Sequence, residues 1–179
     1  MPVDEQTMLN LIEHAIRSSQ WTRARRLILK RLRECPRDHW LLTRLGLTFY
    51  EQRAYRRSLK CSKAALQLAP QCPLVLWDHA GTLQMLGRHR ESLSIYRRLI
   101  RRGTNSIARG PCGEGPARAR ALILDCWYRV AHSETKLKNY KAALAAYRRH
   151  LQLRSRTSGS IYSKRMVTEE LSKVAKMLA

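Results

Sequence analysis

The chain has 179 residues, of which 35 are Lys or Arg and 13 are Asp or Glu, so its formal net charge at pH 7 is +22. This length suits one domain or two small ones, and a hydrophobic content of 44% is too high for a disordered chain. No apolar run reaches the roughly 18 residues that a membrane-spanning helix needs. The acidic N-terminus, MPVDEQTMLN, lacks the pattern of a signal peptide. We therefore expect a cytoplasmic protein.

The cysteines indicate a reducing compartment. There are five, an odd number at irregular spacing, and they include no CxxC pair. A disulfide framework or a zinc ribbon needs paired, regularly spaced cysteines. We expect free thiols, most of which pack as small apolar groups. They are Cys35, Cys61, Cys72, Cys112 and Cys126.

A period of 34 residues organises the chain. Pro36 and Pro70 lie 34 residues apart, each near the end of a stretch with helical apolar periodicity. Counting with this period gives the blocks 5–38, 39–72 and 73–106, and a fourth block at 124–157 after an interruption. Position 17 of the four blocks holds Trp21, Tyr55, His89 and Tyr140, and position 20 holds Ala24, Ser58, Ser92 and Ala143.

This pattern resembles the tetratricopeptide repeat, a helix–turn–helix unit of 34 residues. The best matches are LGLTF at 45–49, AYRRSLKCSKAALQLAP at 54–70, LGRHRESLSIYRRLI at 86–100 and KNYKAALAAYRRHL at 138–151. The resemblance implies an all-α fold, an α-solenoid in which about four repeats form a right-handed superhelix. The segments RGPCGEG, YRRHLQLR and SIY also resemble a group of bacterial repeat proteins without an assigned activity.

The repeats leave two other segments to place within a single domain spanning 1–179. We predict an insertion loop at 103–118, because its core, GPCGEG at 110–115, has three glycines and no apolar period. Pro116 then suits the first turn of the next helix. We predict a capping helix at 162–178, whose apolar side chains recur at helical spacing. These are Val167, Leu171, Val174 and Leu178.

The glycine-rich loop does not indicate catalysis. GPCGEG lacks the Lys and the Ser or Thr that end a phosphate-binding loop. Arg109 and Arg118 would activate the Cys112 thiol, but no histidine lies nearby in sequence to act as a base.

The histidines do not indicate a metal centre. Cys35, His39 and Cys72 would meet near a repeat junction, but zinc needs four ligands, or three and a water. We therefore expect no enzyme, no bound metal and no cofactor.

The first helix of each pair predicts a binding groove. By the resemblance, these helices line the concave face of the superhelix, and their groove positions here are aromatic and apolar. Large aromatics with a polar edge dominate binding hot spots, so we expect an extended or helical peptide with apolar side chains as the guest. Trp40 and Trp77 have an alternative role, which is to fill the groove by packing between helices. The predicted groove residues are Trp40, Leu47, Tyr50, Trp77, Tyr128 and His132.

The positive charge is concentrated on the second helix of each pair. The spans 19–32, 54–68, 88–102 and 139–154 hold 19 Lys and Arg and one acid, Glu91, whereas the first helices sum to −1. By the resemblance, the second helices form the convex face. That face would bind nucleic acid or another polyanion through phosphates, meet an acidic protein or a membrane surface, or be only solvated. The candidate residues are Arg25, Arg26, Arg56, Arg57, Arg97, Arg98, Arg148 and Arg149.

Two hypotheses follow. The leading one is a non-enzymatic adaptor that binds a peptide or protein segment in the aromatic groove. The alternative is a module that binds nucleic acid or a polyanion on the basic convex face, without sequence preference because aromatics for base stacking are few there. The partner's identity and the oligomeric state stay open.

Overall fold

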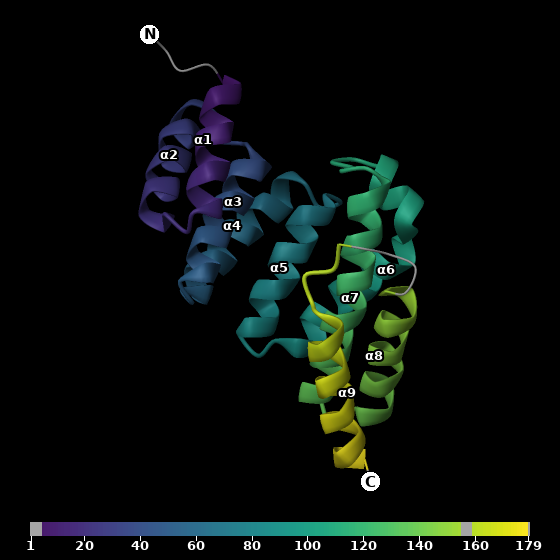
Figure 1. Cartoon of the computed structure of the whole chain (residues 1–179). Coiled ribbons are helices and arrows are strands. Elements are labelled where there is room, and N and C mark those ends of the chain that lie inside the picture. The colour runs from purple at the N-terminus through teal and green to yellow at the C-terminus, as the bar shows by residue number, and fades with distance from the viewer. Residues whose placement is uncertain (1–4, 155–158, 179) are drawn as a thin grey trace. The chain divides into compact units, whose positions relative to one another are not determined.

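The computed structural model describes residues 5–154 and 159–178, and every regular element within these ranges is an α-helix (Figure 1). The chain divides into two compact units, Met1–Thr82 and Leu83–Ala179, where the sequence predicts a single domain. The division falls inside one helix, α5, so each unit is described by itself. The last residues of the fourth predicted block, 155–157, lie outside the described residues.

The first unit is built from successive helices that pack in chain order, α1 on α2, α2 on α3 and α3 on α4. Ile12, Ile28 and Leu41 come from the first three of these helices and are completely buried in a common core. The helices are α1 (Glu5–Arg17), α2 (Trp21–Glu34), α3 (His39–Glu51), α4 (Tyr55–Leu68) and the part of α5 (Pro73–Met85) that precedes residue 83.

Helix α3 has a side-chain cap at its start and packs closely against α4. The Asp38 carboxylate caps it by accepting from the backbone N–H groups of Trp40 (2.8 Å) and Leu41 (3.0 Å). A Cβ atom at Gly46 would lie only 3.3 Å from the Cβ of Cys61 on α4. The small residue at position 8 of the second block therefore lets the two helices of this pair approach closely.

The second unit continues the pattern, with α6 packed on α7, α7 on α8 and α8 on α9. Its largest buried side chains include Tyr96 and Leu99 from α6, Leu124 from α7 and Tyr147 from α8. The helices are α6 (His89–Arg109), α7 (Pro116–Lys136), α8 (Tyr140–Arg154) and α9 (Lys164–Leu178).

The predicted insertion loop at 103–118 is mostly helical, which corrects the expectation. Helix α6 bends at Gly103 (φ 73°, ψ 163°) and then continues to Arg109, and α7 begins at Pro116. The extension is stable because Ile107 and Ala108 are buried, as is Ala119 on the neighbouring helix. Only the six residues GPCGEG separate the two helices.

The turn inside each helix pair has the same geometry four times. Its central residue is left-handed in every case: Ser19 (φ 54°), Arg53 (φ 58°), Gly87 (φ 76°) and Lys138 (φ 61°). The next residue donates its N–H to the carbonyl five residues earlier, as in Asn139 to Glu134 (2.9 Å) and Gln20 to Ala15 (2.8 Å). This pairing satisfies carbonyls at the end of the first helix, and it repeats with the 34-residue period of the first three blocks.

Helix α9 packs on the second unit through part of the predicted stripe. Val167 and Val174 are buried, whereas Leu178 at its end is exposed. The Ser163 hydroxyl accepts from the backbone N–H of Met166 (3.1 Å) and caps the helix, which begins at Lys164. Across the described ranges, none of the helices combines the length and apolar character needed to cross a membrane.

Candidate protein-binding surfaces

The groove residues predicted on α3 and α5 of the first unit are all partly exposed. Trp40 packs with one side against the core that α1–α3 share. Its ring also lies 5.2 Å from the guanidinium of Arg44, which pairs with Glu13 on α1 (2.7 Å). These contacts fix the orientation of the indole and leave it partly exposed.

Tyr50 is held in a similar way at the other end of α3. Its ring meets the ring of Tyr55 edge to face, with centroids 5.5 Å apart. Leu47 and Trp77 are also partly exposed. The first unit thus presents four large apolar side chains that its core does not bury.

Tyr128 differs from these four, because it is buried within the second unit. The ring of Tyr162 stacks on it, with centroids 3.8 Å apart and planes 18° apart. Tyr147 and His150 meet it edge to face at 5.6 and 6.1 Å. Tyr128 is therefore a packing residue, and the expectation that it lines an open groove is corrected. Sequence reasoning missed Tyr162, which precedes α9 and belongs to no repeat.

The segment that carries Tyr162 is tied to α7 by a buried carboxylate. Asp125 accepts hydrogen bonds from the Ser160 hydroxyl (2.5 Å) and the Ile161 backbone N–H (3.3 Å). Burial raises the pKa of Asp125, although these two hydrogen bonds act in the opposite direction. Arg154 adds a hydrogen bond to the carbonyl of Tyr162 (2.5 Å). Together these contacts anchor the start of α9.

His132 lies one helical turn beyond Tyr128 and is partly buried. Burial lowers its pKa to about 4, and the positive charges of Lys136 and Arg129 act in the same direction. Its ring meets that of His89 edge to face at 6.4 Å. His132 is therefore uncharged at neutral pH and offers a polar but neutral surface.

The eight predicted arginines divide equally between the units, and all are exposed except Arg25, which is partly buried. In the first unit, the Arg25 guanidinium donates hydrogen bonds to the side chains of Gln52 and Thr22, the latter at 3.4 Å. The guanidinium groups of Arg25 and Arg57 lie 5.2 and 5.8 Å from the ring centre of Phe49. These two arginines cover an aromatic ring as well as carrying charge.

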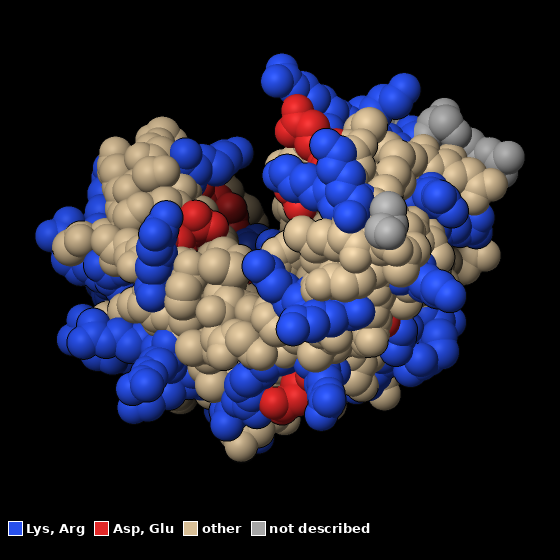
Figure 2. All heavy atoms as spheres, turned by 90° about the horizontal axis from the view of Figure 1, so that it is seen from below, with Lys and Arg blue, Asp and Glu red and all other residues tan. Residues whose placement is uncertain are grey.

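In the second unit, Arg97 and Arg149 both have internal partners. Arg97 pairs with Glu134, whose side chain is only 3% exposed and also accepts from Asn139 (2.8 Å). Arg149 donates to Gln152 (2.7 Å). Figure 2 shows that Lys and Arg are spread over the face in view, with fewer Asp and Glu among them. The basic surface is therefore broad and partly used in internal contacts.

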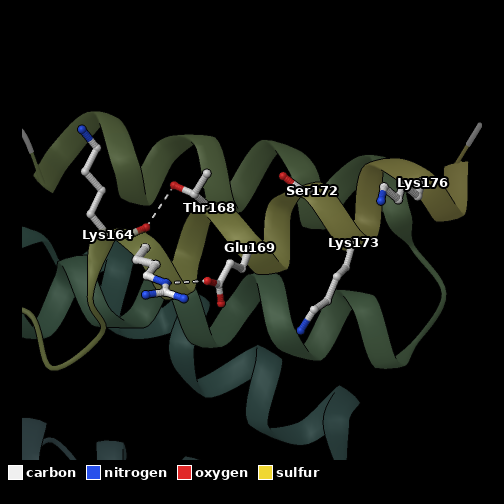
Figure 3. A pocket seen from close by; sticks show the side chains of 7 residues that line it. Lys164, Thr168, Glu169, Ser172, Lys173 and Lys176 are labelled. Carbon is white, nitrogen blue, oxygen red and sulfur yellow. Dashed lines mark hydrogen bonds and ion pairs between the residues drawn. The ribbon is translucent and has the colours of Figure 1, made fainter.

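A shallow hollow of about 600 Å³ follows the outer face of α9 (Figure 3). All seven residues that line it come from this one helix. Arg165 pairs with Glu169 (2.8 Å), and Thr168 donates to the carbonyl of Lys164 (3.0 Å). All seven lining side chains are exposed, which suits the solvent-facing side of a capping helix.

The cysteines give no sign of a disulfide, and all five are free. Cys112 is exposed in the turn between α6 and α7, whereas Cys72 and Cys126 are buried. Burial raises the pKa of Cys126 well above its usual value, so this thiol is not reactive at neutral pH.

Comparisons with known proteins agree with the helix pairs. The family model of the tetratricopeptide repeat matches residues 124–157. The structure of MamA 41-end from Desulfovibrio magneticus RS-1 shares 13% sequence identity, covering 97% of this chain and 94% of that one, with a TM-score of 0.65. MamA AMB-1 C2221 shares 14% identity, covering 96% and 86%, with a TM-score of 0.67.

A further crystal structure of MamA protein shares 16% identity, covering 96% of this chain and 87% of that one, with a TM-score of 0.63. A comparison with curated proteins finds no match. At these identities the likeness to solved structures concerns the fold, which is all-α and built from helical repeats. The family model thus identifies one tetratricopeptide repeat, at 124–157, and the same left-handed turn recurs in four helix pairs of the chain.

Proposed function

We propose that this chain is a non-enzymatic scaffold that binds a segment of a partner protein on the α3 and α5 face of its first unit. The observation that carries the proposal is the partial exposure of Trp40, Leu47, Tyr50 and Trp77. Large side chains of this kind supply much of the energy at protein interfaces once a partner covers them. The five free cysteines suit a reducing compartment such as the cytoplasm.

The chemistry of this face favours an apolar peptide as the guest. Arg44 is already paired with Glu13 and lies over Trp40, so it adds little free positive charge beside the indole. An extended or helical segment would place its own apolar side chains against the two indoles. Because Tyr128 is covered by Tyr162, the proposed contact does not include it.

The test is capture of a partner by the whole chain. We expect Trp40→Ala combined with Trp77→Ala to abolish capture from native lysate while helicity by circular dichroism stays unchanged. Leu29→Ala is the matched control, because it removes an apolar side chain that is 50% exposed on α2. Equal capture by the wild type and the double variant would contradict the proposal.

The alternative function, binding of a polyanion, is supported by the exposed arginines of α4, α6 and α8. Arg56, Arg98 and Arg148 are examples on the three helices. Counterion release makes such binding fall steeply with salt. An oligonucleotide mobility shift that is absent at about 50 mM salt, or that does not change with salt, would exclude this alternative.

A further inference from the structure

A groove of about 530 Å³ lies on the second unit. Side chains of α6, α7 and α8 line it. On each helix these side chains recur at helical spacing, so one face of each helix borders the groove. We call it the α6–α8 groove. It is lined by Arg97, Ile100 and Arg101 of α6, Trp127, Val130 and Glu134 of α7, and Ala142, Ala145, Ala146 and Arg149 of α8.

Small residues on α8 account for the open space. Helices α4 and α8 both begin with a tyrosine, Tyr55 and Tyr140, so their sequences align from these positions. Arg57 and Lys60 of α4 then correspond to two of the groove's alanines. The guanidinium of Arg57 lies over Phe49 in the first unit, whereas no side chain longer than a methyl group projects from Ala142 or Ala145.

The two ends of the groove differ in charge. At one end Glu134 pairs with Arg97, which leaves that end close to neutral. Trp127 lies seven residues, or about 10 Å, before Glu134 along α7. Arg101 lies one turn beyond Arg97 on α6, toward the Trp127 end. Arg149 lies two turns beyond Ala142 on α8, and both arginines are exposed.

The groove thus combines an apolar floor with positive charge concentrated at one end. We propose that it binds an acidic amphipathic helix of a partner protein, with apolar side chains on the alanines and carboxylates against Arg101 and Arg149. A groove about 10 Å long accommodates about two turns of such a helix. Arginine suits this role because its planar fork pairs with carboxylates through two parallel hydrogen bonds.

The same features favour a peptide over a nucleic acid. Binding of single strands relies on aromatic faces for base stacking, and Trp127 is the one aromatic residue among those that line the groove. Half of the lining residues are aliphatic, and such side chains match leucine or isoleucine better than a base. This site also uses different helices from those of the proposed function, so the two proposals fail independently.

The experiment measures fluorescence anisotropy of a labelled peptide of about four helical turns with the full chain. The peptide carries leucines at i, i+3, i+4 and i+7 with flanking glutamates. One matched peptide has glutamines in place of the glutamates, and a labelled oligo-dT of the same length serves as the nucleic-acid probe. We expect the glutamate peptide to bind at least about tenfold more tightly than the glutamine peptide.

The decisive variant is Ala145→Glu, which places bulk and negative charge on the floor at an exposed helical position. We expect it to weaken binding of the glutamate peptide at least about tenfold. Ala175→Glu, an identical change at an exposed position on α9, controls for net charge and should leave binding unchanged. Circular dichroism checks that both variants fold.

Three results would overturn the proposal. The first is no binding of the glutamate peptide up to about 1 mM. The second is equal affinity of the wild type and Ala145→Glu for that peptide. The third is binding of oligo-dT with the same dependence on Ala145→Glu and tighter than the peptide, which would assign the groove to nucleic acid instead.

Discussion

The ring of Tyr162 lies flat on the ring of Tyr128, with centroids 3.8 Å apart. The guanidinium of Arg129 lies 5.6 Å from the centre of the Tyr162 ring. The contact joins the segment before α9 to the middle of α7. It therefore holds the last helix of the second unit in place in addition to the apolar contacts of Val167 and Val174.

Replacing this ring should destabilise the second unit. We expect Tyr162→Ala to lower the free energy of unfolding by about 2–4 kcal/mol, because it removes a buried aromatic side chain and its stacking. Urea denaturation followed by circular dichroism measures the change. Tyr162→Phe keeps the ring and should retain most of the stability. Ile161→Ala, at a neighbouring side chain that is 68% exposed, should have little effect; an equally large loss there would show that stacking is not the cause.

Substitutions in the turn that recurs inside each helix pair should stabilise the chain, in contrast to the loss of Tyr162. Arg53 and Lys138 occupy left-handed conformations that cost a residue with a Cβ atom about 1 kcal/mol relative to glycine. We therefore expect Arg53→Gly and Lys138→Gly each to raise the free energy of unfolding, by somewhat less than this amount because glycine also loses more chain entropy.

Gly87 allows the reverse substitution, because it occupies the same left-handed position of its turn (φ 76°). A Cβ atom at Gly87 would meet no atom within 4 Å, so a side chain there adds backbone strain without a steric clash. Gly87→Lys should lower the midpoint of thermal unfolding. The explanation would be wrong if the Gly87 variant were as stable as the wild type.

The pair of Arg97 and Glu134 should respond unequally to loss of either partner. Glu134 is 3% exposed and Arg97 is 50% exposed. Arg97→Ala leaves a buried carboxylate whose remaining contact is Asn139, so we expect a loss of about 1–3 kcal/mol. Glu134→Gln keeps hydrogen-bonding atoms at the same place and should cost less. Arg148→Ala removes an exposed arginine from α8 and should change stability by less than about 0.5 kcal/mol. Chemical denaturation of the three variants under one condition tests the order.

Stability should depend on pH through His132. Its pKa is about 4 in the folded chain against an ordinary value of 6.5, so unfolding takes up a proton between these two values. The contribution of His132 is full above pH 6.5 and is lost as the pH falls toward about 4. We expect His132→Leu to flatten the decline of the urea midpoint over this range. His14→Leu, at an exposed position on α1, should leave the decline unchanged. A wild-type midpoint that is constant over this range would contradict the prediction.

The helix pairs could be predicted because their cause is local and repeated. Small residues recur where two helices cross, as Gly46 against Cys61 illustrates, and apolar residues recur at helical spacing. The left-handed turns could not be read from composition, since Arg53 and Lys138 are not residues that favour this conformation. Packing of the helices on both sides imposes the turn and overrides the local preference.

The exposure of the residues in the candidate binding surfaces was harder to predict than the helices. Exposure depends on contacts between segments far apart in the chain, and the Tyr128 ring is covered by a residue outside the repeats. The alanines at 142 and 145 read in the sequence as residues that let helices pack closely. The structure shows that both are exposed, on the side of α8 that lines the α6–α8 groove.

The short connection between α6 and α7 lacks the residues that trypsin recognises, although the chain is very basic. Trypsin cleaves after Lys and Arg in flexible backbone, and GPCGEG contains neither. The arginines on either side lie in helices, whose extended ends are stabilised by buried Ile107 and Ala119. A glutamate-specific protease, by contrast, has Glu114 directly accessible. Limited digestion with that enzyme would open the second unit between its two longest helices and leave both of them whole.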